Sequence, residues 1–248
     1  MSKIIHMIEN FKYNIVISLT FLLILTLLSF YLYPVELSSS HEVAIGLLWR
    51  TISETASSKG AILTLLIFIV FCFRKKDKSW EKIINSMIQL FILLVISLGL
   101  KTGIKQLTHS PRPYTKFMVQ SSVISSVNEF YSLNHTDKIK KISQMNDIVS
   151  DSRLSNWRQE MNYSFPSGHT VFVTLCLLFF GRILLESKKY ILFSLLLIWS
   201  CSVACSRLWL GMHRPADLYG AVLLENLIFI LVPDQYRITQ WLIRIIKL

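Results

Sequence analysis

The run IINSMIQLFILLVISLGL occupies residues 83–100 and contains no charged side chain. Its length approaches the roughly 20 apolar residues that a helix needs to cross the hydrocarbon core of a bilayer. Comparable runs recur along the chain, so we predict an all-α integral membrane protein, a bundle of six transmembrane helices forming one domain over residues 1–248. The polar segment 106–165 has apolar residues at helical spacing, and we expect a small helical cap there, outside the cytoplasm. The predicted spans are approximately residues 14–33, 55–73, 83–101, 169–186, 190–206 and 217–233.

The composition of the 248-residue chain supports a membrane location. Hydrophobic residues make up 52% of the chain and charged residues only 17%, whereas soluble domains carry roughly 25% charged residues. The net charge of +11 raises the question of a nucleic-acid partner. The cations, however, lie at the ends of the apolar runs and in the loops between them, as membrane topology and anionic headgroups favour. We therefore expect a lipid bilayer, and no nucleic acid, as partner.

The two ends of the chain carry apolar segments of different kinds. A secretory signal peptide has an apolar region of about 7–15 residues before a small-residue cleavage site. The run at residues 14–33 is longer, and Ser38, Ser39 and Ser40 match such a site poorly, so we expect an uncleaved first span, with a signal peptide as the alternative. Residues 235–248 have the pattern of an amphipathic helix lying at the membrane surface.

Lysine and arginine residues predict which side of the membrane each loop faces. They crowd residues 74–82 and 182–189, and they also occur near both ends of the chain. With six spans, all four regions fall on one side, and because short basic loops stay in the cytoplasm, we place both termini there. Residues 34–54, 105–168 and 210–216 then face the opposite side, which is the periplasm in a bacterium.

Three polar clusters fall at the outer ends of predicted spans, although they lie far apart in the sequence. Taken singly, each has an ordinary explanation as a basic residue at the end of a span, a helix cap, or an acidic residue matching a helix dipole. Those explanations do not account for three clusters on one face, so we predict an active site there. The clusters are Lys105 with Arg112-Pro113, then Pro166-Ser167-Gly168-His169, and then Ser206-Arg207 with His213 and Asp217.

The basic residues of the clusters suit the binding of a phosphoryl group. Arginine can hold two phosphate oxygens at once and lysine supplies a point charge, and Lys105, Arg112 and Arg207 offer both. Ser167 and Gly168 lie where a span begins, and the free N–H groups at a helix N-terminus bind anions. We expect these five residues to bind phosphate.

The two histidines suit phosphoryl transfer, because the pKa of histidine lies near neutrality and the ring can act as nucleophile or as acid. We expect Pro215 to begin the last span, which places Asp217 in its first turn, four residues after His213. Asp217 would then orient His213 and stabilise its positive charge during attack on phosphorus. His169 remains as the proton donor to the leaving alcohol.

Together the clusters resemble the three-part signature of the type 2 phosphatidic acid phosphatase superfamily, with every signature position matched in order from Lys105 to Asp217. The resemblance implies a phosphohistidine mechanism that uses no metal or other cofactor, with His213 as nucleophile, Asp217 as its orienter and His169 as proton donor. It also implies that membrane lipid phosphates are the partners. The residues that it implies for phosphate binding are Lys105, Arg112, Ser167, Gly168 and Arg207.

Segments around the signature are similar to the bacterial phosphatidylglycerophosphatase B group of that superfamily, notably residues 128–133, 157–160 and 165–170. That group implies a location in the bacterial cytoplasmic (inner) membrane. It implies hydrolysis of phosphatidylglycerophosphate to phosphatidylglycerol and phosphate, and further activity on undecaprenyl diphosphate, phosphatidate, lysophosphatidate and diacylglycerol diphosphate. Two departures bear on substrate preference: Arg214 stands where an aromatic residue is expected, and the helix expected at 138–150 is only loosely similar.

Other functions stay open at this point. The chain is alternatively an enzyme acting mainly on undecaprenyl diphosphate, or a non-catalytic binder or transporter of lipid phosphates, which would need the cations but not both histidines and Asp217. A soluble haloperoxidase with the same anion site is disfavoured by the apolar spans, and a purely structural membrane protein leaves the clusters unexplained.

We predict no metal site among the remaining titratable residues. Four histidines outside the clusters have no carboxylate or cysteine partner at metal-ligand spacing. Glu225 lies inside the last predicted span, where we expect a protonated or hydrogen-bonded packing role. The four histidines are His6, His41, His109 and His135.

Overall fold

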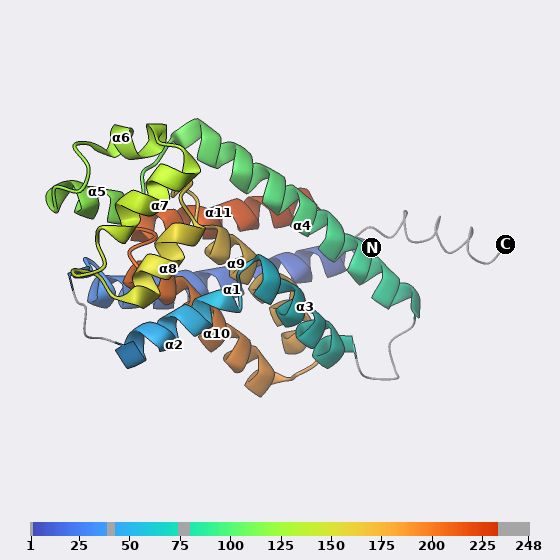
Figure 1. The fold of residues 1–248 in the computed structure, drawn as a ribbon. Helices are drawn as coiled ribbons and strands as arrows, with labels where there is room; N and C mark the ends of the chain where they lie inside the picture. Colours follow the sequence, from blue (N-terminus) through green and yellow to red (C-terminus); the bar gives the residue numbers. More distant parts are fainter. Residues whose placement is uncertain (1, 39–42, 74–79, 233–248) are drawn as a thin grey trace.

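The computed structural model describes residues 2–38, 43–73 and 80–232, and within these ranges the chain forms helices and no strand, which confirms the all-α prediction (Figure 1). The basic residues at 74–79 and the predicted amphipathic tail at 235–248 lie outside the described residues. Four short helices gather at one end of the bundle and are called the cap below: α5 (Pro113–Gln120), α6 (Val127–Ser132), α7 (His135–Ser143) and α8 (Asp151–Gln159). The bundle contains α1 (Ser2–Leu32), α2 (Val43–Glu54), α3 (Ser58–Phe73), α4 (Trp80–Thr108), α9 (Gly168–Glu186), α10 (Tyr190–Trp209) and α11 (Pro215–Leu231).

Helix α9 is the centre of the bundle. Its residues are apolar on almost every side, and a helix of that kind is buried among other elements. It packs against α1, α3, α4, α10 and α11, and Leu177, Phe179 and Phe180 are completely buried in these contacts. Because lipid tails are as apolar as these side chains, close van der Waals packing, rather than removal from water, stabilises such helix pairs.

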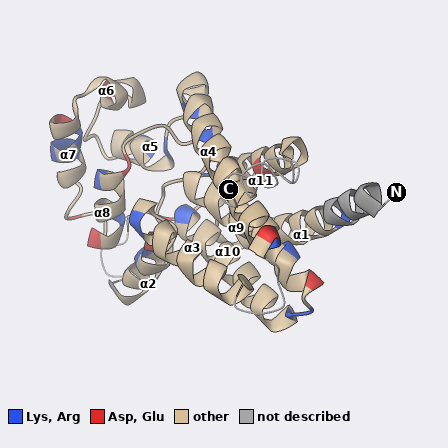
Figure 2. Ribbon diagram, turned by 90° about the vertical axis from the view of Figure 1, so that its right-hand side faces the viewer, with Lys and Arg blue, Asp and Glu red and all other residues tan. Residues whose placement is uncertain are grey.

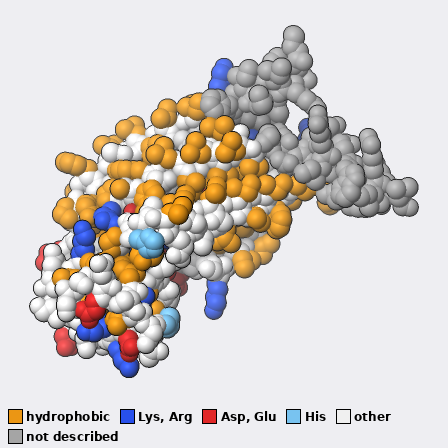
Figure 3. Space-filling view, turned by 90° about the horizontal axis from the view of Figure 1, so that it is seen from above, with side chains coloured by type: hydrophobic (Ala, Val, Ile, Leu, Met, Phe, Trp, Pro, Cys, Tyr) orange, Lys and Arg blue, Asp and Glu red, His pale blue; other side chains and the backbone are white. Residues whose placement is uncertain are grey.

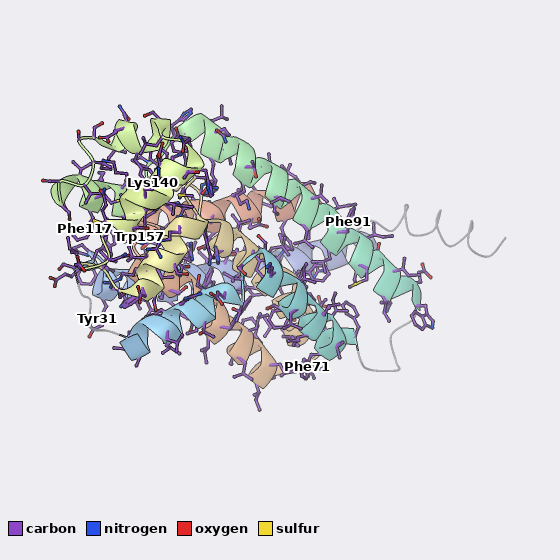
Figure 4. All side chains as sticks on the ribbon, viewed as in Figure 1. Tyr31, Phe71, Phe91, Phe117, Lys140 and Trp157 are labelled. Carbon is purple, nitrogen blue, oxygen red and sulfur yellow. The ribbon has the colours of Figure 1, made fainter. Side chains whose placement is uncertain are left out.

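The outer faces of the long helices are apolar, which is the reverse of a soluble protein. Leu19 and Leu23 on α1 are 62% and 63% exposed, and Phe91 on α4 is 67% exposed. Figure 4 shows the side chains of Tyr31, Phe71 and Phe91 on the outside of the bundle. Hydrophobic side chains spread over the body of the molecule in Figure 3, whereas charged residues gather over the cap and at helix ends (Figures 2 and 3). So continuous an apolar surface marks a membrane protein.

Within the described residues, four helical segments are long and apolar enough to cross a membrane, and a bent pair of helices makes a fifth if the pair is one span. The pair joins residues 44–54 to residues 58–73 at an angle of 66°. This count is lower than the predicted six, and the difference lies in α11, which has 17 residues. The four unbroken segments are Lys12–Leu32, Trp80–Gln120, Gly168–Glu186 and Tyr190–Trp209.

The bend between α2 and α3 was not predicted, because α2 falls in a segment that we expected to lie outside the membrane domain. The N–H groups of Thr55 and Ala56 bond to carbonyls three residues earlier, and this tight turn ends α2. Helix α2 then packs against α8 and α10. Gly46 permits the approach, because a Cβ atom there would lie 3.0 Å from the hydroxyl oxygen of Ser152.

The ends of the helices away from the cap carry the basic turn between α9 and α10. Lys189 donates a hydrogen bond to the carbonyl oxygen of Phe71, 3.1 Å away, so this turn lies beside the end of α3 (Figure 1). Charged residues therefore mark both ends of the bundle, with the apolar outer faces between them.

The cap is built around Trp157, which is fully buried. Its ring stacks on Tyr114 with ring centroids 4.8 Å apart, and Phe130 meets Tyr114 edge-on. Its indole N–H donates to the carbonyl oxygen of Leu210, 2.8 Å away. Through this bond the cap is attached to the turn between α10 and α11.

Helix α7 ends at Ser143, although the apolar spacing predicted a helix to residue 150. The residues that gave that spacing are still buried, since Met145 is fully buried and Val149 is 1% exposed. They reach the core of the cap through turns, and Asn146-Asp147 between them favour turns because their side chains bond to nearby backbone. The apolar spacing therefore predicted correctly that Met145 and Val149 are buried, but it predicted a helix where the chain forms turns.

A glycine of α11 gives a test of the packing between the bundle and the loop before α9. A Cβ atom at Gly220 would overlap the ring of Phe165, and such overpacking costs about 1–3 kcal/mol. We expect Gly220→Ala to lower the Tm of the detergent-solubilised protein. Gly99→Ala on α4 is the control, because nothing lies within 4 Å of its Cβ position. Equal Tm values for the two variants would contradict this packing.

Candidate active site

The three clusters predicted from the sequence meet where the bundle joins the cap. Lys105 is in the last turn of α4, and Arg112 precedes α5 as its N-cap. Ser167 caps α9, with Gly168 and His169 following it, and Arg207 lies near the end of α10. His213 lies in the turn before α11, and Asp217 lies in its first turn because α11 begins at Pro215, as predicted. The structure thus brings all eight predicted site residues together.

The His213 ring is buried and contacted at both nitrogens. Arg112 Nη1 lies 3.2 Å from Nε2 of His213. A guanidinium group has only donors, so Nε2 accepts this hydrogen bond and carries no hydrogen. The ring hydrogen is then on Nδ1, which lies 3.2 Å from Ser164 Oγ and 3.5 Å from Asp217 Oδ2. In the resulting tautomer Nε2 is unprotonated, and its electron pair accepts the hydrogen bond from Arg112.

Ser164 is a site residue that the sequence analysis missed. Its hydroxyl donates to Asp217 Oδ2 and lies between that carboxylate and His213 Nδ1. The same Asp217 oxygen accepts the backbone N–H of Arg214, 2.8 Å away, as part of the cap of α11. A serine three positions before Ser167 carries no signal in the sequence, because it belongs to no motif that we considered.

The Lys105 ammonium group bonds to the backbone in this structure. It donates to the carbonyl oxygens of Tyr163 and of Ser164, the latter 3.2 Å away. Lys105 therefore fixes the loop that carries Ser164 into place beside His213.

The start of α9 is attached directly to α11. The backbone N–H of Ser167 donates to the carbonyl oxygen of Asp217, 3.0 Å away, and its hydroxyl accepts from the hydroxyl of Thr170, 2.9 Å away. The N–H groups of Gly168 and His169 belong to the first turn, where a helix supplies no acceptor of its own. The side chain of Lys101 passes close to Gly168. A Cβ atom added at Gly168 would lie 3.2 Å from Cδ of Lys101.

Two fully buried arginines share one carboxylate, that of Glu160, which the sequence analysis had given no role. Glu160 Oε2 lies 3.0 Å from Arg112 Nη2, and Oε1 lies 2.7 Å from Arg207 Nη2. Oε1 also lies 3.7 Å from Nδ1 of His169. Burial alone raises the pKa of the Glu160 carboxyl, but the nearby positive charge outweighs it, Arg207 most of all, and holds that pKa well below its ordinary value. The carboxyl is therefore ionised at neutral pH.

The remaining donors of the two arginines bond to neutral groups. Arg112 Nε donates to the carbonyl oxygen of Asn162 at 2.8 Å, and its Nη2 donates to the side-chain oxygen of Asn162 at 2.6 Å. Arg207 Nη1 donates to Ser53 Oγ at 2.6 Å and to Asn156 Oδ1 at 3.3 Å. Ser53 belongs to α2, so the unexpected helix contributes directly to the site.

Burial and the surrounding cations act on the protonation of His213. Burial is the largest cause, followed by the charges of Arg112, Lys105 and Arg207, and together they lower the pKa of His213 well below the ordinary 6.5, although Glu160 opposes them. The ring is therefore neutral at neutral pH, in agreement with the tautomer that the hydrogen bonds define.

Two other residues discussed from the sequence are not among the eight predicted site residues, although Arg214 contacts one of them, Asp217. Arg214 Nη2 donates to Ser110 Oγ at 2.8 Å and to the carbonyl oxygen of Pro111 at 2.7 Å, so its guanidinium holds the loop before Arg112. Glu225 is fully buried in α11, about 12 Å along the helix from Asp217 by helix rise. No group of three or more His, Cys, Asp or Glu side chains suited to a metal ion occurs in the described ranges.

Comparisons with known proteins identify the family that the chain resembles. A sequence profile of the PAP2 superfamily matches residues 85–240, which contain all three clusters. The chain is 32% identical over 187 residues to phosphatidylglycerophosphatase B of Haemophilus influenzae, covering 71% of this chain and 76% of that protein. It is 29% identical over 184 residues to phosphatidylglycerophosphatase B of Escherichia coli K12, covering 70% and 69%.

Removal of the Ser164 hydroxyl tests the contact between α11 and the loop before α9. A hydrogen bond to a charged group contributes roughly 1.5–3 kcal/mol, so we expect Ser164→Ala to lower the Tm clearly. Ser200→Ala is a matched control, because Ser200 is equally buried but its hydroxyl bonds only to a carbonyl of its own helix. If the two variants unfold at the same temperature, Ser164 does not hold Asp217 as described.

Proposed function

Because the chain belongs to the type 2 phosphatidic acid phosphatase (PAP2) superfamily, it is a phosphatase of lipid phosphates, and we propose that phosphatidylglycerophosphate is a principal substrate. The products are phosphatidylglycerol and inorganic phosphate. We include undecaprenyl diphosphate, phosphatidate, lysophosphatidate and diacylglycerol diphosphate as further substrates, because each ends in a phosphoryl group. The observation that carries the mechanism is the unprotonated Nε2 of His213, which faces the Arg112 guanidinium at 3.2 Å.

In the first step of the proposed reaction, Nε2 of His213 attacks the terminal phosphorus. A P–N bond forms and the bond from phosphorus to the lipid oxygen breaks, while His169 gives its proton to that oxygen. The ring of His213 becomes positively charged, and Asp217 with Ser164 holds its Nδ1–H and stabilises the charge. The lipid alcohol, or a lipid monophosphate when the substrate is a diphosphate, then leaves.

In the second step a water molecule attacks phosphorus in the phosphohistidine. His169, now neutral, takes a proton from that water, and the P–N bond breaks. Inorganic phosphate and the free His213 ring are released, so each group returns to its starting protonation state.

Stabilisation of the phosphoryl group falls to donors that converge on His213. Such catalysis depends mainly on positioned positive charge and hydrogen-bond donors. The proposal assigns the equatorial oxygens to Arg112 and Arg207, to the hydroxyl of Ser167 and to the N–H group of Gly168 at the start of α9, since the N–H of Ser167 already donates to Asp217. Lys105, which bonds to the backbone of the loop that carries Ser164, adds positive charge near the phosphoryl group.

The apolar outer faces and the charged helix ends support a place for the enzyme in the membrane. We propose six spans with α11 as the last, both termini in the cytoplasm, and the cap and active site on the periplasmic side of a bacterial cytoplasmic membrane. A lipid phosphate would then reach the site laterally, with its tails in the bilayer and its phosphate at the depth of the helix ends. A non-catalytic binder is disfavoured, since it would not need the His213–Ser164–Asp217 arrangement.

The central test is phosphate release by the purified protein in detergent with excess chelator. Phosphatidylglycerophosphate and undecaprenyl diphosphate are compared side by side, for the native chain and His213→Ala. We expect turnover to persist in chelator and to fall by at least about 10³-fold in the variant, as for loss of an enzymatic nucleophile.

A labelled terminal phosphate should also give a phosphoprotein that is labile in acid and stable in base, and this species should be absent from His213→Ala. The ratio of the turnover rates on phosphatidylglycerophosphate and on undecaprenyl diphosphate ranks these two substrates. Release of phosphate by His213→Ala at the native rate would refute the histidine mechanism.

The pH profile gives an independent test of the His213 nucleophile. Its pKa is lowered, so the reactive neutral ring persists to lower pH, and the acidic limb of kcat/KM should lie below pH 6.5. Lys105→Met removes one of the cations that lower this pKa, so the limb should move to higher pH. Substrate ionisation is common to both profiles, and their difference therefore reports the enzyme. A limb that does not move, or moves to lower pH, would contradict the assignment.

A further inference from the structure

Glu160 contacts two of the groups that the proposed function assigns to phosphate, Arg112 and Arg207, and lies near His169, which it assigns as the proton donor. Its two oxygens lie 3.0 Å from Arg112 Nη2 and 2.7 Å from Arg207 Nη2, and one of them is 3.7 Å from His169 Nδ1. A carboxylate bridging two guanidinium groups makes the same kind of charge-assisted contact as two oxygens of a phosphoryl group.

The donor hydrogens of the Arg112 guanidinium group all have partners in this structure. Nη2 of Arg112 has two hydrogens, and it donates one to Glu160 and one to the Asn162 side chain. Nη1 likewise donates to the carbonyl oxygen of Met212 and to His213. A phosphoryl group therefore gains a bond to Arg112 Nη2 only if Glu160 or Asn162 gives one up.

Arg207 is arranged differently and retains donors. Its Nη1 donates to Ser53 and Asn156, and its Nη2 donates to Glu160. Its Nε is buried and has no hydrogen-bond partner among the described residues. A buried donor of this kind is costly unless an acceptor satisfies it, and a tetrahedral phosphoryl group offers more oxygens than the two of a carboxylate.

Glu160 has room to leave the arginines. It follows the last residue of α8, and its side chain is 29% exposed. It also lines a cavity of about 420 Å³ in the cap, beside the ammonium-bearing Lys138 and the His135 ring. Since a water molecule takes roughly 30 Å³, this cavity can accept a displaced carboxylate with its hydration.

We infer that Glu160 is an internal competitor for the phosphate site, whose carboxylate must swing toward the cap cavity when a phosphoryl group binds and returns to the arginines as inorganic phosphate leaves. This inference rests on the proposed function for the identity of the site. A tethered carboxylate acts at a high effective concentration, so it competes strongly with free phosphate. A lipid substrate also binds through its tails, and this additional binding offsets the competition from Glu160. Free phosphate has no tails. Glu160 thus favours release of the product over its retention.

The test measures binding of inorganic phosphate by the purified full-length chain in detergent, with no lipid and no turnover. Titration calorimetry and the phosphate-dependent rise in Tm are both used. We expect Glu160→Gln to bind phosphate about tenfold more tightly or better, since a regained charge-assisted bond is comparable to a tenfold change in affinity. Glu160→Asp, which keeps the charge but reaches less far, should fall between Glu160→Gln and the native chain.

The control is Glu129→Gln in the cap. The Glu129 side chain is 30% exposed and also pairs with a cation, Lys141, at 3.6 Å, so its removal changes the charge of the cap equally without touching the arginines. Its phosphate affinity should match that of the native chain. In lipid assays, phosphate should inhibit Glu160→Gln at about tenfold lower concentration than the native enzyme, a gain that a merely damaged fold would not produce.

Unchanged or weaker phosphate binding by Glu160→Gln would overturn the inference. If Glu160→Gln fails to fold, the ranking of Glu160→Asp against the native chain decides in the same way. Such a result, together with turnover that His213→Ala abolishes, would leave the proposed function standing. Tight phosphate binding by Glu160→Gln, without lipid turnover in the native chain, would support the inference about Glu160 but contradict the proposed function.

Discussion

The two buried guanidinium groups of Arg112 and Arg207 impose the main constraint on this molecule. A buried charge is costly unless it is paired and its donors are satisfied. Glu160 supplies the negative charge, and the neutral acceptors come from α2, from α8, from the loop before α9 and from the turn after α10. Elements far apart in the sequence therefore have to meet at this one place. The cap, which Trp157 attaches to the turn after α10, brings Asn156 and Glu160 to Arg207.

Those parts of the structure that have a local cause were predictable from the sequence. A helix that crosses a bilayer needs an apolar run, and the runs at 83–101, 169–186 and 190–206 lie within α4, α9 and α10, although α4 continues to Thr108. Pro215 begins α11 for the reason expected, since proline suits the first position of a helix. The convergence of the site followed from placing each cluster at the same end of its span, and it needed no knowledge of side-chain contacts.

What the sequence did not predict depends on contacts between distant residues. Ser164 and Glu160 have no distinctive neighbours in the sequence, and their importance comes from Asp217 and Arg207, about fifty residues later. The bend after α2 is similar, because residues 43–54 are stabilised by packing on α8 and α10 rather than by an apolar run. In the cap, spacing alone predicted too long a helix at 138–150, because Asn-Asp turns can bury the same residues.

The bond between Trp157 and the carbonyl oxygen of Leu210 has a consequence for biosynthesis. Trp157 and Leu210 are 53 positions apart, and α9 and α10 lie between them. At roughly 5–20 residues per second, a ribosome takes several seconds to make that stretch. During this time the cap segment has already been synthesised but its anchor does not yet exist. His213 and Asp217 follow Leu210 in the chain, so the active site is completed only after α10 and the start of α11 have been synthesised.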